Sequence, residues 1–157
     1  MCGGDCAGRE AEGGLIAILR PPPQSTSKGA VNSVGVHCDL VFRDTVANST
    51  SSSSSTRAVF QAAHQDSLAA LARSWVVIHY DGDLSRSSQG DWSQPLYSFQ
   101  VARSVAESSS GQRAVMDVPQ ALPLTVGGLG VVGRRVSLVE GTGIGAQRIA
   151  EGIIGWN

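Results

Sequence analysis

The chain has 157 residues and a formal net charge of −1. This length fits one domain and is enough to bury a substantial apolar core. Apolar residues make up 41% and charged residues 16%, a composition typical of a folded protein rather than a disordered one. The near-neutral charge gives no general electrostatic attraction to nucleic acid or acidic lipid. We therefore expect one folded domain that binds neither nucleic acid nor membranes.

The compartment follows from what the sequence lacks. No apolar run reaches the roughly 20 residues needed to cross a bilayer, and the chain does not start with the basic stretch and apolar core of a secretion signal. The three cysteines, Cys2, Cys6 and Cys38, are an odd number, which argues against a disulfide framework and suits a reducing compartment. We therefore expect a cytoplasmic protein.

The first half of the chain predicts a leader and two strands. Residues 1–13 are rich in Gly, Asp and Glu without an apolar period, which predicts a flexible leader before a domain over residues 14–157. Residues 15–19 are wholly apolar and end before three prolines, as a buried strand would. Apolar residues alternate over 36–42, which predicts a strand with one buried face. Residues 48–56 are almost all Ser and Thr and predict a surface loop.

The second half predicts six more short strands separated by Gly, Ser, Pro and Asp clusters. Eight short strands at such spacing favour an antiparallel sandwich or barrel over a parallel sheet. Two segments, 65–72 and 146–154, also allow a short helix. The six expected strands cover residues 57–62, 74–80, 97–102, 113–118, 134–139 and 148–154.

Two glycine-rich motifs have the form of dinucleotide-binding fingerprints. Residues 128–133 fit GxGxxG, and residues 141–146 fit GxGxxA. The first leads into an expected strand instead of a helix. After the second there is no room for the further strand and acidic residue, about 20 positions on, that such a site needs. We interpret both as glycine turns.

Metal-ligand candidates are few. Cys2 and Cys6 are three residues apart and could bind a soft ion such as Cu(I) as thiolates; the alternative is two solvated thiols near a chain end. His37, His64 and His79 lie far apart without metal-ligand spacing. Each alone is more typical of a surface or hydrogen-bonded core histidine.

Four segments in order resemble the Cu,Zn superoxide dismutase family: Val-Val-Ile-His-Tyr-Asp-Gly-Asp-Leu from Val76, Gln-Gly-Asp-Trp-Ser-Gln-Pro from Gln89, Val-Val-Gly-Arg-Arg-Val from Val131, and Thr-Gly-Ile-Gly-Ala-Gln-Arg-Ile-Ala-Glu-Gly-Ile-Ile-Gly from Thr142. The last is the most specific. The resemblance spans residues 14–155 and implies an eight-stranded Greek-key β-barrel or sandwich.

The departures from the family pattern bear on catalysis. His79 retains the second histidine of the family's His-x-His pair. Val77 stands where the family has the first histidine of that pair, and Val139 stands where it has another copper-binding histidine. Trp92 stands near the bridging histidine, and Glu151 replaces the disulfide cysteine. A redox metal needs several imidazoles in fixed geometry. The resemblance therefore predicts a non-enzyme, with Cys2, Cys6 and His79 as weak metal candidates.

A metal-poor version of this fold is typical of the central domain of the copper chaperone for superoxide dismutase, which uses the fold to bind its client. Residues 2–8 and 79–85 are similar to that chaperone type. The resemblance implies a non-catalytic binding module, with a superoxide dismutase or homologous barrel as partner in a hetero- or homodimer. It implies no firmly held cofactor, and at most Cu(I) for loading the partner.

If the family's dimer surface carries over, three short segments form it. Gly133 and Gly152 would allow close backbone approach, while Ile153 and Ile154 would supply apolar contact. Plain barrel packing or turn geometry is the alternative for each position. The candidate interface residues are Asp81, Gly82, Asp83, Val132, Gly133, Arg134, Gly152, Ile153, Ile154 and Gly155.

Two other classes of function remain open. In the first, the chain is a structural subunit of a larger assembly that uses a degenerate dismutase fold as a spacer. In the second, it is a hydrolase or nucleotide-binding enzyme, which would require helices over both 65–72 and 146–154.

Overall fold

A computed structural model of the chain describes residues 14–22, 36–45, 55–62, 64–86, 94–101, 113–142 and 145–157. The regular structure of the described chain is mainly β, as the sequence predicts. Its helical elements include α1 (Gln65–Leu71) and the 3-10 turn η2 (Leu84–Arg86). Neither is long and apolar enough to span a membrane. The eight strands are β1 (Leu15–Leu19), β2 (Cys38–Thr45), β3 (Ser55–Ala62), β4 (Ser74–Ile78), β5 (Tyr97–Gln100), β6 (Arg113–Asp117), β7 (Arg135–Glu140) and β8 (Gln147–Trp156).

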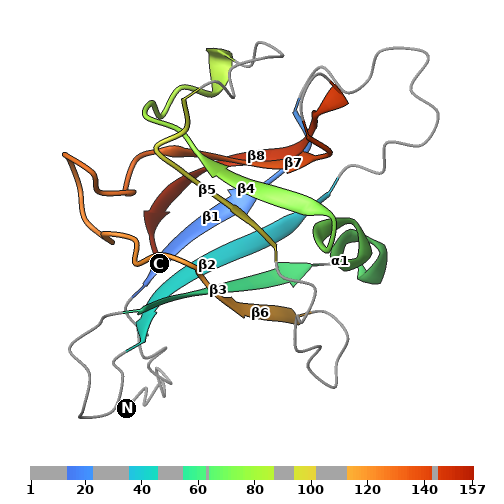
Figure 1. Ribbon diagram of the computed structural model, residues 1–157, viewed down its shortest axis with the longest axis horizontal. Coiled ribbons are helices and arrows are strands. Elements are labelled where there is room, and N and C mark those ends of the chain that lie inside the picture. Colours follow the sequence, from blue (N-terminus) through green and yellow to red (C-terminus); the bar gives the residue numbers. More distant parts are fainter. Residues whose placement is uncertain are drawn as a thin grey trace, which may run out of the picture.

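All eight strands belong to one antiparallel sheet that curls into a half-barrel (Figure 1). Their order across the sheet is β5-β4-β7-β8-β1-β2-β3-β6. The pairing of β1 with β8 therefore joins the half that holds β2, β3 and β6 to the half that holds β4, β5 and β7. This seam lies in the middle of the sheet, because four strands stand on each side of it.

Alternation along each strand creates the core. In β1, Leu15, Ala17 and Leu19 point inward and are at most 1% exposed, whereas Ile16 and Ile18 point outward. Phe42 of β2 and Phe60 of β3 fill the same interior and are fully buried. Fully burying a side chain of this size contributes roughly 1.5–3 kcal/mol, so the inward rows dominate the stability of the sheet.

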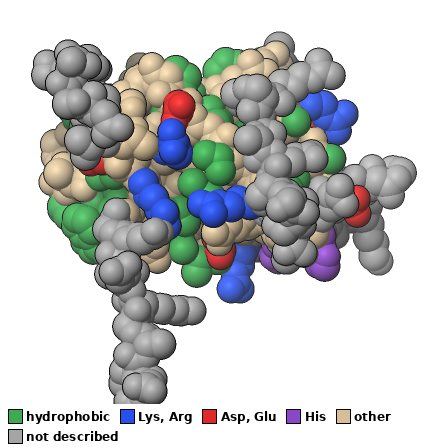
Figure 2. Space-filling view, turned by 90° about the horizontal axis from the view of Figure 1, so that it is seen from below, with side chains coloured by type: hydrophobic (Ala, Val, Ile, Leu, Met, Phe, Trp, Pro, Cys, Tyr) green, Lys and Arg blue, Asp and Glu red, His purple; other side chains and the backbone are tan. Residues whose placement is uncertain are grey.

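The outer face of β2 and β3 combines apolar and charged rows. Val41 lies opposite Val59 and both are buried, while the neighbouring row pairs Arg43 with Arg57. Arg57 forms an ion pair with Asp117 of β6, at 3.0 Å. Figure 2 shows Lys and Arg side chains lying among hydrophobic ones on the face seen from below. This half of the sheet therefore presents a mixed, charged surface.

One expectation from the sequence needs correction. The Ser/Thr run was expected to be a loop as far as residue 56, but β3 starts at Ser55. Thr56 is fully buried, and its hydroxyl accepts a hydrogen bond from the backbone N–H of Leu122, at 2.9 Å, which offsets the cost of burying a polar group. Of the two segments that allowed a helix, 65–72 forms α1, whereas 146–154 falls almost wholly in β8. The expected leader over 1–13 lies outside the described residues.

Candidate functional site

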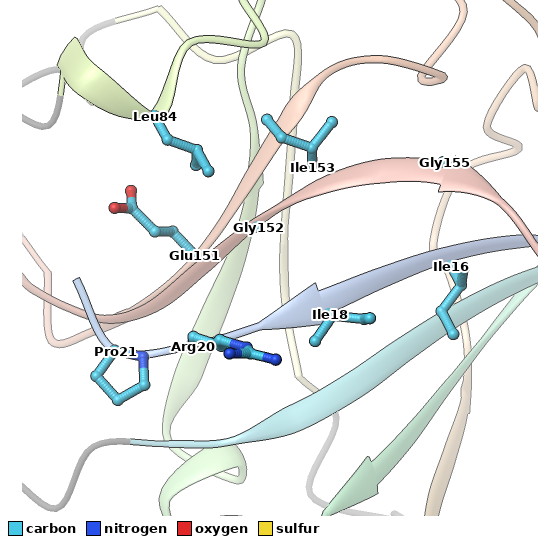
Figure 3. Close-up of a pocket in the computed structure, with 9 residues that line it drawn as sticks. All are labelled: Ile16, Ile18, Arg20, Pro21, Leu84, Glu151, Gly152, Ile153 and Gly155. Atoms are coloured by element: carbon cyan, nitrogen blue, oxygen red, sulfur yellow. The ribbon is translucent and has the colours of Figure 1, made fainter. Parts of the chain in front are cut away.

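An apolar groove runs along the outer face of the β1–β8 seam (Figure 3). Its volume is about 460 Å³, within the range of typical small-molecule pockets. Ile16 of β1 lies here opposite Gly155 of β8, and Arg20, which directly follows β1, lies opposite Glu151 of β8. The lining residues are Ile16, Ile18, Arg20, Pro21, Leu84, Glu151, Gly152, Ile153 and Gly155.

The groove exposes large aliphatic side chains. Ile18 is 55% exposed and Leu84 is 41% exposed. Leu84 projects from η2 toward the strands, so that the aliphatic walls come from two separate segments (Figure 3). Clustered exposed apolar side chains mark interaction surfaces more often than single ones do. The groove is therefore a candidate docking surface.

Two glycines of β8 shape the groove in different ways. A Cβ atom on Gly152 would lie 2.4 Å from the carbonyl oxygen of Ile18, so glycine is what allows β1 and β8 to approach at this point. A Cβ atom on Gly155 would meet nothing within 4 Å. Gly155 therefore keeps the floor of the groove open, whereas Gly152 serves the packing of the sheet.

Charged residues stand at one end of the groove. Glu151 is only 6% exposed, and its carboxylate accepts a hydrogen bond from the guanidinium of Arg148, at 2.9 Å. Arg148 is itself 9% exposed. Burial of two charges is tolerated when they are paired in this way. Arg20, by contrast, is exposed at the rim.

The structure brings the three expected interface segments together at one end of β7 and β8. The backbone N–H of Gly133 donates to the carbonyl of Ile154, at 2.8 Å, and the N–H of Ile154 donates to the carbonyl of Arg134, at 2.9 Å. The N–H of Arg135 donates to the carbonyl of Asp81, at 2.8 Å. Only three of the ten candidates, Gly152, Ile153 and Gly155, line the groove.

Several other candidates serve the fold. Ile154 is fully buried in the core. The Arg134 guanidinium donates to the carbonyls of Gly130, at 3.1 Å, Gly128, at 2.7 Å, and Tyr80. Arg134 therefore ties the loop that follows β4 to the loop that precedes β7. These residues position the neighbourhood of the groove without lining it.

Among the remaining candidates, Asp83 accepts hydrogen bonds from the backbone N–H and hydroxyl of Ser85, at 2.8 and 2.6 Å. Val132 packs against the core. The Asp81 carboxylate lies 3.5 Å from the Arg135 guanidinium. Each of these contacts shapes the loops beside β7.

The sequence reasoning missed Ile16, Ile18, Arg20, Leu84 and Glu151 as groove residues. The wholly apolar run 15–19 reads as a strand buried on both faces, which hides its outward isoleucines. The available signal was the charged residue at position 20, which continues the outward row of residues 16 and 18.

Of the three metal candidates, His79 is the one that lies among the described residues. His79 is 3% exposed, and its Nε2 lies 3.0 Å from the hydroxyl oxygen of the buried Ser137. Val77 and Val139 share this outer face of β4 and β7 and are also buried. The described residues contain no group of three or more His, Cys, Asp and Glu side chains that could bind a metal. Cys2 and Cys6 lie outside the described residues.

Neither a scan against models of known protein families nor a search of curated proteins finds a match for this chain.

Proposed function

We propose that this chain is a non-catalytic, superoxide dismutase-like module of the copper-chaperone type, which binds a superoxide dismutase through the groove on its β1–β8 face. The observation that carries the proposal is the exposure of Ile18 of β1 and Leu84 of η2 in one groove. Burying each such side chain against a partner gains roughly 1.5–3 kcal/mol before the costs of association are subtracted.

The order of the strands supports the dismutase-like part of the proposal. In a Greek key, three consecutive strands lie side by side and a fourth returns to lie beside the first. Joining the two outer strands of the sheet, β5 and β6, would give the order β7-β4-β5-β6, which has this form. The curl of the sheet brings its two ends toward the same side of the core (Figure 1).

The side chains on the outer face of β4 and β7 support the absence of catalysis. His79 lies beside Val77, Ser137 and Val139, where the resemblance would place further copper ligands. One imidazole hydrogen-bonded to a hydroxyl cannot hold a redox metal in the geometry that dismutation requires. We expect no dismutase turnover after loading with copper and zinc.

The copper-loading part of the proposal depends on Cys2 and Cys6. Two thiolates are suitable ligands for Cu(I). A bound Cu(I) ion would be cargo for the partner, and the groove would hold that partner during transfer.

Sedimentation velocity with purified Cu,Zn superoxide dismutase tests the docking. We expect the chain to form a complex with the dismutase, and Ile18→Asp to weaken it at least tenfold. Val126→Asp is the matched control, because Val126 is 71% exposed and does not line the groove. If the wild-type chain forms no complex, the proposed function fails and a structural subunit becomes the better interpretation.

A further inference from the structure

The geometry points to a partner segment of defined chemistry: an extended strand that places an aliphatic side chain in the groove and a carboxylate against Arg20. This inference deepens the proposed function and rests on its docking surface. It assigns to Arg20 the role of selecting an acidic partner over a basic one.

Arg20 is an exposed cation at the rim of the groove. Its side chain is exposed and forms no ion pair with any residue that the structure describes. Arg73 and Arg148, by contrast, each face a carboxylate, at 3.4 and 2.9 Å. A partner carboxylate would therefore meet a guanidinium that gives up no ion pair with the described part of the chain. Hydrogen bonds between ionised groups are among the stronger ones.

The pairing of Glu151 with Arg148 explains why the Glu151 carboxylate does not neutralise Arg20. The two residues are paired across the β1–β8 seam, with backbone hydrogen bonds of 3.0 and 2.8 Å in the two directions. The Glu151 carboxylate is nevertheless bound to Arg148 and buried. A basic group on the partner would be repelled by the like charge of Arg20, and the Glu151 carboxylate is already paired with Arg148. A basic partner is therefore disfavoured.

The spacing along β1 sets the pattern of the partner. Ile16, Ile18 and Arg20 are alternate residues on the outward face of the same segment. Alternate residues of a strand are roughly 6.6 Å apart. An extended partner strand matches this row when two aliphatic residues and then an acidic residue occupy every second position, as in Leu-Ser-Leu-Ser-Glu. Its two leucines and its glutamate then lie on the same face of the strand.

A peptide titration followed by NMR tests the inference without the dismutase. The probes are acetyl-Leu-Ser-Leu-Ser-Glu-amide and the same peptide with Lys in place of Glu, added to the 15N-labelled chain. We expect the Glu peptide to shift the amides of Ile18, Arg20 and Ile153, and to bind at least five times more tightly than the Lys peptide. Arg20→Gln should remove this preference, whereas Arg73→Gln, at an exposed arginine away from the groove, should keep it. Equal binding of the two peptides, or shifts outside the groove, would overturn the inference.

A second measurement separates this inference from the proposed function. Arg20→Glu should weaken the dismutase complex at least fivefold. If the dismutase binds the wild type and Arg20→Glu equally well, Arg20 does not select the partner, although the docking proposal stands. If the dismutase does not bind while the chain prefers the Glu peptide, the proposed function fails and the inference about partner chemistry holds.

Discussion

The backbones of Gly82 and Gly133 are in direct contact, since a Cβ atom built on Gly82 would lie 2.2 Å from the carbonyl oxygen of Gly133. Gly133 has a φ of +79°, a conformation that L side chains rarely adopt. The contact joins the loop after β4 to the turn before β7. It lies close to η2, which contacts β8 and carries Leu84 to the groove.

Gly82→Ala should destabilise the fold, because the obstructing atom is backbone and the loops must separate to admit the methyl group. We expect the free energy of unfolding to fall by about 1–3 kcal/mol, measured by urea denaturation. Gly155→Ala is the matched control, because a Cβ atom there meets nothing within 4 Å. Equal loss of stability in the two variants would contradict the packing described here.

The buried pair of Arg148 and Glu151 should be costly to break. Glu151→Gln leaves the cation of Arg148 buried beside a neutral amide, and removing one partner of such a pair typically costs about 3–5 kcal/mol. Because glutamine retains a hydrogen-bonding oxygen, we expect the loss of stability to lie near the lower end of this range. Replacing both residues, as in the double variant Arg148→Met with Glu151→Leu, should cost less than the sum of the two single substitutions. If the free energies of unfolding lost by the two single variants add up to the loss of the double variant in chemical denaturation, the two charges are not coupled.

Cys38 should make stability depend on alkaline pH. Burial in the core raises the pKa of its thiol from 9.0 to about 12, with a smaller contribution from Asp39. The unfolded thiol therefore ionises at lower pH than the folded one, so stability is unaffected below about pH 9 and falls as the pH rises toward 12. At about pH 10.5 the free energy of unfolding should be lower by roughly 2 kcal/mol. Cys38→Ala should lack this part of the alkaline loss in thermal unfolding, and identical pH profiles would contradict the assignment.

Copper binding should depend on the two cysteines near the start of the sequence. Protein purified under reducing conditions and loaded with Cu(I) should hold one copper per chain, and Cys2→Ser should lose it. His79→Ala should retain copper, because the imidazole of His79 is buried against Ser137. Elemental analysis checks each variant. Copper retained by Cys2→Ser and lost by His79→Ala would reverse the assignment.

The sequence predicted the strands better than the site. Val36, Cys38, Leu40 and Phe42 alternate in sequence, and all four are buried in the structure. The groove depends on which neighbour covers each outward side chain, and the apolar run that contains Ile18 gives no sign that this residue is half exposed. Likewise, nothing local to β4 indicates that His79 meets Ser137, a contact between residues 58 positions apart. Such contacts follow from the sheet order, which the strand pattern alone does not fix.

Methyl NMR of the isoleucine-labelled chain tests the central claim most directly, because the isoleucines divide between the groove and the core. Adding Cu,Zn superoxide dismutase should shift or broaden the methyl signals of Ile16, Ile18 and Ile153, which line the groove. The signals of Ile78 and Ile154, which are fully buried in the core, should change far less. Unchanged groove signals at saturating dismutase would contradict the account.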